Sequence, residues 1–205
     1  MARSLAFDPD IALNAALDTF WQRGYQGSSI QVLLDAMGLN RGSLYNQFGD
    51  KDQLFQSVLM RYFQRYPELV ISLLDHSPDP IAGIDAVFQL TLVQLPEQQR
   101  QCGCLLVNTV AELSDSHREH AEQAQALLTQ VEQAFARALQ RAQHSGQWQH
   151  PALNAKTAAR LLFTYLTGLR ITTRLGMPSE AIQEQITVLM QTLALHSTPE
   201  VKDAP

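Results

Sequence analysis

Cysteine is scarce in this 205-residue chain, which has only Cys102 and Cys104. Because these two residues are so close in sequence, they cannot close a useful structural loop, and a reduced protein is expected. Long apolar runs are also missing. The longest are only a few residues, such as Cys104–Val107, and are far too short for a membrane-spanning helix. Acidic residues appear from Asp8 onward, before a signal-peptide core could form. These absences predict a cytoplasmic protein that does not contact the membrane.

Positive charge is limited, with 15 basic against 20 acidic residues and a net charge of −5. This balance argues against a polybasic tail and against indiscriminate binding of nucleic acid. The surplus is uneven, because basic and acidic residues are equal in number up to residue 65 and all the excess acid lies beyond it. Any contact with nucleic acid is therefore expected in the first third of the chain.

Sequence motifs of enzymes are missing as well. The chain has no Gly-rich phosphate loop, no readable pair of catalytic carboxylates and no nucleophile elbow. His117 and His120 could share a helix face near Glu112, but the charged residues around them predict a solvated surface. No histidine follows a glutamate by three positions, as a di-iron site in a helical bundle would need. We therefore predict no enzyme, no cofactor and no metal site.

Helical periodicity and helix-capping residues are present throughout, and no stretch alternates as a strand does. Asp8-Pro9 opens the first helix, Ser28 or Ser29 the second, and the pair Asp50 and Gln53 forms a capping box. The sequence predicts an all-α fold of about nine helices, over residues 8–24, 28–38, 40–48, 50–66, 79–96, 103–113, 116–146, 154–176 and 178–193.

No flexible linker separates two globular parts. We expect an N-terminal domain over residues 1–50, continued by the start of a shared fourth helix to about residue 66. A second domain is expected over residues 67–196. The polar tail, 197–205, is expected to fray.

The segment from Ser28 to Phe48 predicts two short helices around a turn that begins at Gly38. The second helix presents small and polar residues outward, which lets its backbone approach a major groove and its donors reach phosphates and base edges. Leu44 and Phe48 point inward instead. A plain helical hairpin in a bundle would show the same exposed polar face. From spacing alone, a DNA reader and a helical ligand-binding protein without DNA function both remain open, with a bundle enzyme as a third class.

Residues Ala16–Phe20, Gly24-Tyr25, Ser28–Ile30 and Met37–Lys51 together resemble the DNA-binding domain of the tetracycline-repressor (TetR) family of bacterial transcription regulators. The resemblance covers about residues 8–55. It implies binding of palindromic double-stranded operator DNA through eight residues: Ser28, Ser29, Arg41, Gly42, Ser43, Tyr45, Asn46 and Lys51. Where many relatives carry His or Tyr, this chain has Asn46-Gln47, and either residue could reach DNA.

The resemblance also implies a homodimer, because two reading helices must meet successive turns of a duplex, roughly 34–36 Å apart. The expected four-helix interface comes from the last two helices. Those helices could instead complete the core of a single chain. The predicted interface residues are Leu161, Leu162, Tyr165, Leu169, Ile182, Ile186, Leu189 and Met190.

A pocket for an unknown small-molecule effector is implied within the later helices. Each of its candidate residues could equally be ordinary core. They are Phe63, Tyr66, Phe88, Leu92, Asn108, Phe135, Phe163 and Arg170.

Gly103-Cys104-Leu105 resembles a segment at the sixth helix in one branch of the family, whose members include regulators that respond to oxidants or electrophiles. Free amides at a helix start would favour the Cys104 thiolate. The alternative is that Cys104 is a small core residue and Cys102 is incidental. The sequence is thus interpreted as a sequence-specific homodimeric repressor, released from its operator by a small molecule or by cysteine modification.

Overall fold

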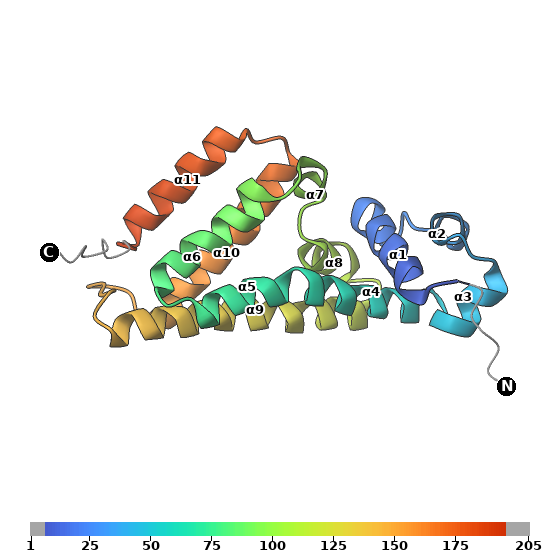
Figure 1. Ribbon diagram of the computed structural model, residues 1–205, viewed down its shortest axis with the longest axis horizontal. Coiled ribbons are helices and arrows are strands. Elements are labelled where there is room, and N and C mark those ends of the chain that lie inside the picture. The colour runs from blue at the N-terminus through green and yellow to red at the C-terminus, as the bar shows by residue number, and fades with distance from the viewer. Residues whose placement is uncertain (1–6, 196–205) are drawn as a thin grey trace, which may run out of the picture. The chain divides into compact units, whose positions relative to one another are not determined.

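The computed structural model describes residues 7–195, and every regular element in that range is a helix (Figure 1). The predicted all-α fold is confirmed. The predicted frayed tail, 197–205, lies outside the described residues. Contacts divide the chain into two units, one of Met1–Glu68 with Cys104–Leu128 and the other of Leu69–Gly103 with Thr129–Pro205.

The first unit begins with four helices, α1 (Pro9–Arg23), α2 (Ile30–Met37), α3 (Arg41–Phe48) and α4 (Lys51–Arg65). Each starts at the polar side chain that local capping rules require. The Asp8 carboxylate caps α1, the Asn40 side chain caps α3, and Asp50 and Gln53 form the expected capping box at α4. Ser29, rather than Ser28, caps α2. We call α1, α2 and α3 the head.

The head packs around apolar side chains that the helical spacing already placed on one face. Leu17, Phe20, Leu33 and Leu44 are fully buried, and the ring of Phe20 meets that of Phe55 edge-on at 4.8 Å between centroids. Gly38 ends α2 with a left-handed φ of 64°, which glycine adopts without steric cost. The first unit is completed by α8 (Leu105–Leu113) and by the beginning of α9 (Arg118–His144).

The second unit contains most of α5 (Pro67–His76), then α6 (Pro80–Phe88), a π-helical segment η1 (Gln89–Gln94) and α7 (Glu97–Cys102). It also contains the rest of α9, α10 (Ala155–Arg174) and α11 (Ser179–Thr192). The helices predicted from the sequence do not include α5 or α7, and the helix predicted over residues 79–96 covers both α6 and η1. Pro67 begins α5 because a first helical residue needs no free N–H.

The core of the second unit is one apolar cluster shared by α6, α9, α10 and α11. Figure 1 shows α6 and α11 running alongside one another. Phe88 and Phe135 are fully buried there. Trp148 belongs to the same cluster. It is 1% exposed, and its Nε1 donates a 2.9 Å hydrogen bond to the carbonyl oxygen of Leu193.

Most of the predicted interface residues lie inside this core, which corrects the sequence interpretation. Leu162, Ile182 and Ile186 are at most 1% exposed, so they have no surface left for a partner. Leu169, Leu189 and Met190 are also buried, at 6–9% exposed. Leu161, at 46%, is exposed, and Tyr165 is half-buried. The periodic apolar faces of α10 and α11 therefore serve first to build the single chain.

Adjacent residues on α10 provide a direct test of this correction. Leu162→Ala removes a fully buried side chain, and we expect it to lower the free energy of unfolding by about 3 kcal/mol. Leu161→Ala, the matched control, truncates an exposed side chain and should change it by less than about 0.5 kcal/mol. Urea denaturation of the two variants measures both values. Equal losses at the two positions would contradict the assignment.

Candidate nucleic-acid interface

The exposed face of α3 is formed by Arg41, Gly42, Tyr45, Asn46 and Gln47. Tyr45 is 46% exposed, although its aromatic ring would gain stability if it were buried. Leu44, on the opposite side of α3, is fully buried and fixes the helix to the head. The face is short, polar and carries a single full charge, that of Arg41.

Ser43 and Ser29 lie at the starts of their helices, while Ser28 does not. The Ser43 amide donates to the Asn40 side chain at 2.8 Å, and the Ser29 hydroxyl accepts from the Val32 amide at 3.3 Å. Ser29 is exposed. Ser28 is fully buried, and its hydroxyl donates to the Gly24 carbonyl oxygen at 2.7 Å. Ser28 therefore stabilises the α1–α2 turn, and its predicted phosphate contact is wrong.

Lys51 is the first residue of α4 and lies against the head. Its Nζ is 4.1 Å from the centroid of the Tyr25 ring, a cation–π distance. Burial lowers the pKa of Lys51, although the carboxylates of Asp52 and Glu112 partly oppose that effect. The ammonium group is thus held at the edge of the head by the aromatic ring beneath it.

Tyr25 is buried in the α1–α2 turn and hydrogen bonds through its hydroxyl to Asp52. The same Asp52 oxygen is 2.9 Å from His120 Nε2. The Tyr25 ring also stands 4.6 Å from the His117 ring and 5.4 Å from the His120 ring, measured between centroids. His120 is 2% exposed. The predicted solvated surface is therefore wrong at His120, which packs into the first unit.

The hydrogen bonds in this cluster shift two pKa values in opposite directions. The Tyr25 hydroxyl has a raised pKa, chiefly because it is buried and also because it bonds to the Asp52 carboxylate. The Asp52 carboxyl has a lowered pKa, chiefly because the Tyr25 hydroxyl and then His120 hydrogen bond to its ionised form. Asp52 is therefore held as a carboxylate at neutral pH.

Glu112, near the end of α8, binds the α1–α2 turn through both carboxylate oxygens. The Tyr25 amide donates to Oε2 at 3.0 Å and the Gln26 amide donates to Oε1 at 2.8 Å. Gly24 passes so close that a Cβ there would stand 2.6 Å from Glu112 Oε2. In the sequence, Glu112 stands out only as a neighbour of the two histidines. This role is not visible there, because its partners lie 87 and 86 residues away.

The predicted effector-pocket residues divide between the two units. In the second unit, Phe88, Leu92 and Phe135 are fully buried core residues, and Phe163 packs against that core. Arg170 is 7% exposed and donates to the carbonyl oxygens of Thr91 (2.7 Å) and Gly103.

The other three candidates belong to the first unit. Phe63 is buried, and the ring of Tyr66 stands 5.1 Å from that of Trp21. Asn108 is half-buried on α8. All eight residues stay predictions as ligand contacts.

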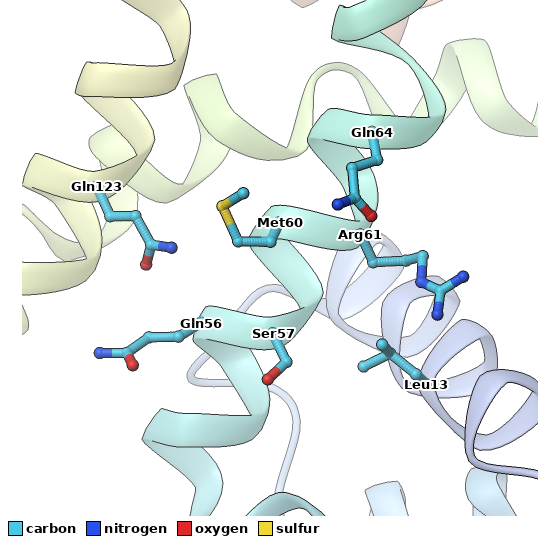
Figure 2. Close-up of a pocket in the computed structure, with 7 residues that line it drawn as sticks. All are labelled: Leu13, Gln56, Ser57, Met60, Arg61, Gln64 and Gln123. Atoms are coloured by element: carbon cyan, nitrogen blue, oxygen red, sulfur yellow. The ribbon is translucent and has the colours of Figure 1, made fainter.

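A surface pocket of about 460 Å³ lies elsewhere in the first unit and shares no residue with those candidates. Figure 2 shows its lining, which comes mainly from α4, with one residue each from α1 and α9. Arg61, one of these residues, forms an ion pair with Asp10 and so is already partnered. The lining residues are Leu13, Gln56, Ser57, Met60, Arg61, Gln64 and Gln123.

Both cysteines are half-buried, and within residues 7–195 neither forms a disulfide. Cys104 is the N-cap residue of α8, one residue after the predicted helix start at Gly103, and its side chain caps no amide. Cys102 ends α7, with Sγ 3.2 Å from the Gln98 carbonyl oxygen. Gly103 between them has a φ of 69°.

Comparison with known proteins supports the helix-turn-helix interpretation. The family model described as bacterial regulatory proteins, tetR family, matches residues 12–58, and that described as tetracyclin repressor-like, C-terminal domain, matches residues 80–189. The uncharacterized HTH-type transcriptional regulator YezE of Bacillus subtilis is 27% identical over 94% of this chain and 100% of its own. The HTH-type transcriptional repressor ComR of Escherichia coli is 26% identical over 89% of this chain and 87% of its own.

Among solved structures, a cysteine-substituted form of the TetR family transcriptional regulator CifR, complexed with 26 bp double-strand operator DNA, superposes with a TM-score of 0.83. It is 26% identical and covers 94% of this chain and 100% of that one. The chain belongs to the tetR family of bacterial regulatory proteins. It is a transcription regulator and not an enzyme. Within residues 7–195, no helix is long and apolar enough to cross a membrane.

The lowered pKa of Asp52 predicts a pH-dependent contribution to stability. An aspartate has a pKa of about 3.9 when unfolded, so the contribution is complete above that value and is lost as the pH falls through the lower folded pKa. Asp52→Asn should lower the free energy of unfolding by about 1 kcal/mol at pH 7. This difference from the natural chain should shrink below about pH 4.

Urea denaturation between pH 7 and pH 3 measures this difference. Asp35→Asn, which changes an exposed aspartate on α2, is the matched control and should show a smaller effect throughout. A loss in Asp52→Asn that stayed constant down to pH 3 would contradict the assignment.

Proposed function

We propose that this regulator is a repressor that binds palindromic operator DNA as a homodimer and leaves it when a small molecule or a cysteine modification changes its conformation. The observation that carries this proposal is the polar, exposed face of α3, fixed to a well-capped head by the buried Leu44. A helix presented in this way can enter a major groove with its N-terminal residues toward the base edges.

Individual roles follow from exposure and chemistry. Arg41 can donate two hydrogen bonds to a guanine or bind a phosphate, and Tyr45 can contact a phosphate or a thymine methyl. Ser43 and Asn46 supply further polar groups beside them, and Gly42 keeps the backbone accessible. Ser29 at the start of α2 and Lys51 at the start of α4 are placed to contact phosphates.

The relatives favour repression over activation. ComR bears the name of a repressor, and the CifR structure contains operator DNA. The low positive charge of this chain supports the need for two copies, because few phosphates are neutralised by each head and the affinity of one head would be weak.

The outer surface of α10 supports a homodimer through residues other than most of those predicted. The exposed positions Leu161, Thr164, Gly168, Ile171 and Leu175 follow one another at intervals of three and four, which places them on one side of the helix. Leu161, Ile171 and Leu175 are 46%, 50% and 82% exposed. Gly168 has open space where a Cβ would stand, so a partner helix could approach closely.

On α11, Val188 is 48% exposed and extends the apolar surface of the second unit. Tyr165 is fixed by a hydrogen bond from its hydroxyl to Gln185 on α11. We therefore propose an interface built on the exposed side of α10 and α11, with Leu161 and Tyr165 kept from the original set.

A mobility-shift assay tests the proposal, using DNA from the region upstream of the protein's own gene at two salt concentrations. We expect binding that random DNA of equal length does not compete away. Arg41→Ala should weaken it about tenfold, because a bidentate base contact or a phosphate contact is lost. Arg23→Ala, which removes an exposed basic residue at the end of α1, is the control. Unchanged affinity in Arg41→Ala would favour a ligand-binding protein without DNA function.

A second assay addresses cysteine modification. If the Cys104 thiolate reacts with an electrophile, benzoquinone should release the natural chain from operator DNA, and Cys104→Ser should stay bound under the same conditions. Cys102→Ser is the matched control, because Cys102 lies at the end of α7 rather than at the start of α8. If Cys104→Ser is released at the same quinone concentration as the natural chain, Cys104 is not the sensor. A non-covalent effector then remains as the cause of release.

A further inference from the structure

The backbone of the α1–α2 turn is held from outside the head by the carboxylate of Glu112. Both oxygens of Glu112 accept hydrogen bonds from consecutive backbone amides, those of Tyr25 and Gln26, at 3.0 and 2.8 Å. Because the acceptor is ionised, such bonds are stronger than those between neutral groups. Since both oxygens are used, the carboxylate cannot rotate without losing one of them.

The shape of the turn is matched to this carboxylate. Gly24 has a φ of 73°, and an added Cβ would meet Glu112 Oε2 at 2.6 Å. Two separate constraints, backbone conformation and space, therefore require glycine beside Glu112. The turn leads directly into Ser29 and α2, and α2 leads through Gly38 into α3. Holding the turn consequently holds the helix that presents Arg41 and Tyr45.

Two further contacts tie the same region of the chain to the head. We call residues 112–120, which join α8 to α9, the α8–α9 corner. His120 binds Asp52 at 2.9 Å, and Glu119 accepts a hydrogen bond from Gln56 Nε2 at 3.0 Å. These two contacts reach α4. Glu112 binds the backbone of the α1–α2 turn, where the rings of His117 and His120 also stand against the Tyr25 ring.

The residue two positions before the start of α8 also makes a tertiary hydrogen bond. Gly103, two residues before the helix, accepts a hydrogen bond from the buried Arg170 of α10. Cys104 lies between Gly103 and α8. A displacement of residues 103–104 would therefore move the first turn of α8 and, through the helix, the side chain of Glu112.

We propose that Glu112 is a positioning residue for DNA binding: it fixes the α1–α2 turn to the end of α8, so that a movement of α8 changes the position of α3. The inference rests on the proposed function, since it concerns how the DNA-reading helix is held. It assigns no DNA contact to Glu112 itself.

Glu112→Gln is the sharpest variant because it preserves size. Its amide has one oxygen and one NH2 group, so only one of the two backbone amides keeps an acceptor. Glu122→Gln is the matched control, since Glu122 lies on α9 and forms an exposed i, i+4 ion pair with Arg118. Lys51→Ala is the comparison for a lost phosphate contact.

Three quantities are measured: amide hydrogen exchange at Tyr25 and Gln26, affinity for the upstream DNA, and the dependence of that affinity on salt. In Glu112→Gln we expect exchange to accelerate and operator affinity to fall about tenfold, with an unchanged salt slope. Lys51→Ala should instead reduce the salt slope by about one. Glu122→Gln should match the natural chain in all three.

The inference is overturned if Glu112→Gln keeps its operator affinity within about twofold while exchange accelerates. It is also overturned if affinity falls only in proportion to the unfolded fraction, measured from the thermal midpoint. Should Glu112→Gln not fold, Glu112→Asp keeps the charge on a shorter side chain and must show a smaller loss of the same kind. If the natural chain does not prefer its upstream DNA to random DNA, the proposed function itself fails. That failure is seen in the natural chain, so it is distinct from any result for Glu112→Gln.

Discussion

The burial of Tyr25 is the interaction on which the first unit depends. The residue is 6% exposed, and its ring lies against Phe20 of the head, Phe55 of α4, and His117 and His120. Removing a phenol hydroxyl from water costs free energy unless it finds a partner, and Asp52 is that partner. A single side chain therefore requires α1, α4 and the α8–α9 corner to be in place together, and the Lys51 ammonium packs on the face of the same ring.

The sequence contained enough information to predict the head because its helices are bounded by local rules. Asp8, Asn40 and the Asp50–Gln53 pair cap helices as their identities required, and Gly38 supplied the left-handed turn residue. The exposed face of α3 followed from the same periodicity. Local rules could not decide whether Ser28 or Ser29 caps α2. The Ser28 hydroxyl is buried and donates its hydrogen bond back to the Gly24 carbonyl oxygen, which leaves Ser29 as the cap.

Contacts between distant segments were beyond the reach of the sequence. Glu112 and His120 read as parts of a charged surface turn, yet one holds two backbone amides and the other is buried beside Asp52. Apolar periodicity had a similar limit on α10. The periodicity identified Leu162 as a residue to be buried, but it could not show whether the same chain or a partner buries it. In the structure the same chain buries Leu162, and the adjacent Leu161 stays exposed. Additional residues such as Ile171 and Leu175 were identified only from their exposure in the folded chain.

The π-helical turn η1 makes the second unit sensitive to chain length at one place. Such a turn is an α-helix that accommodates an extra residue, so a one-residue deletion between Gln89 and Gln94 could be absorbed by reverting to ordinary α-helical winding. The Thr91 carbonyl oxygen would then rotate away from Arg170, a residue that is 7% exposed and donates hydrogen bonds to this carbonyl and to that of Gly103. A more regular helix would thus leave the buried cation of Arg170 with one carbonyl acceptor fewer.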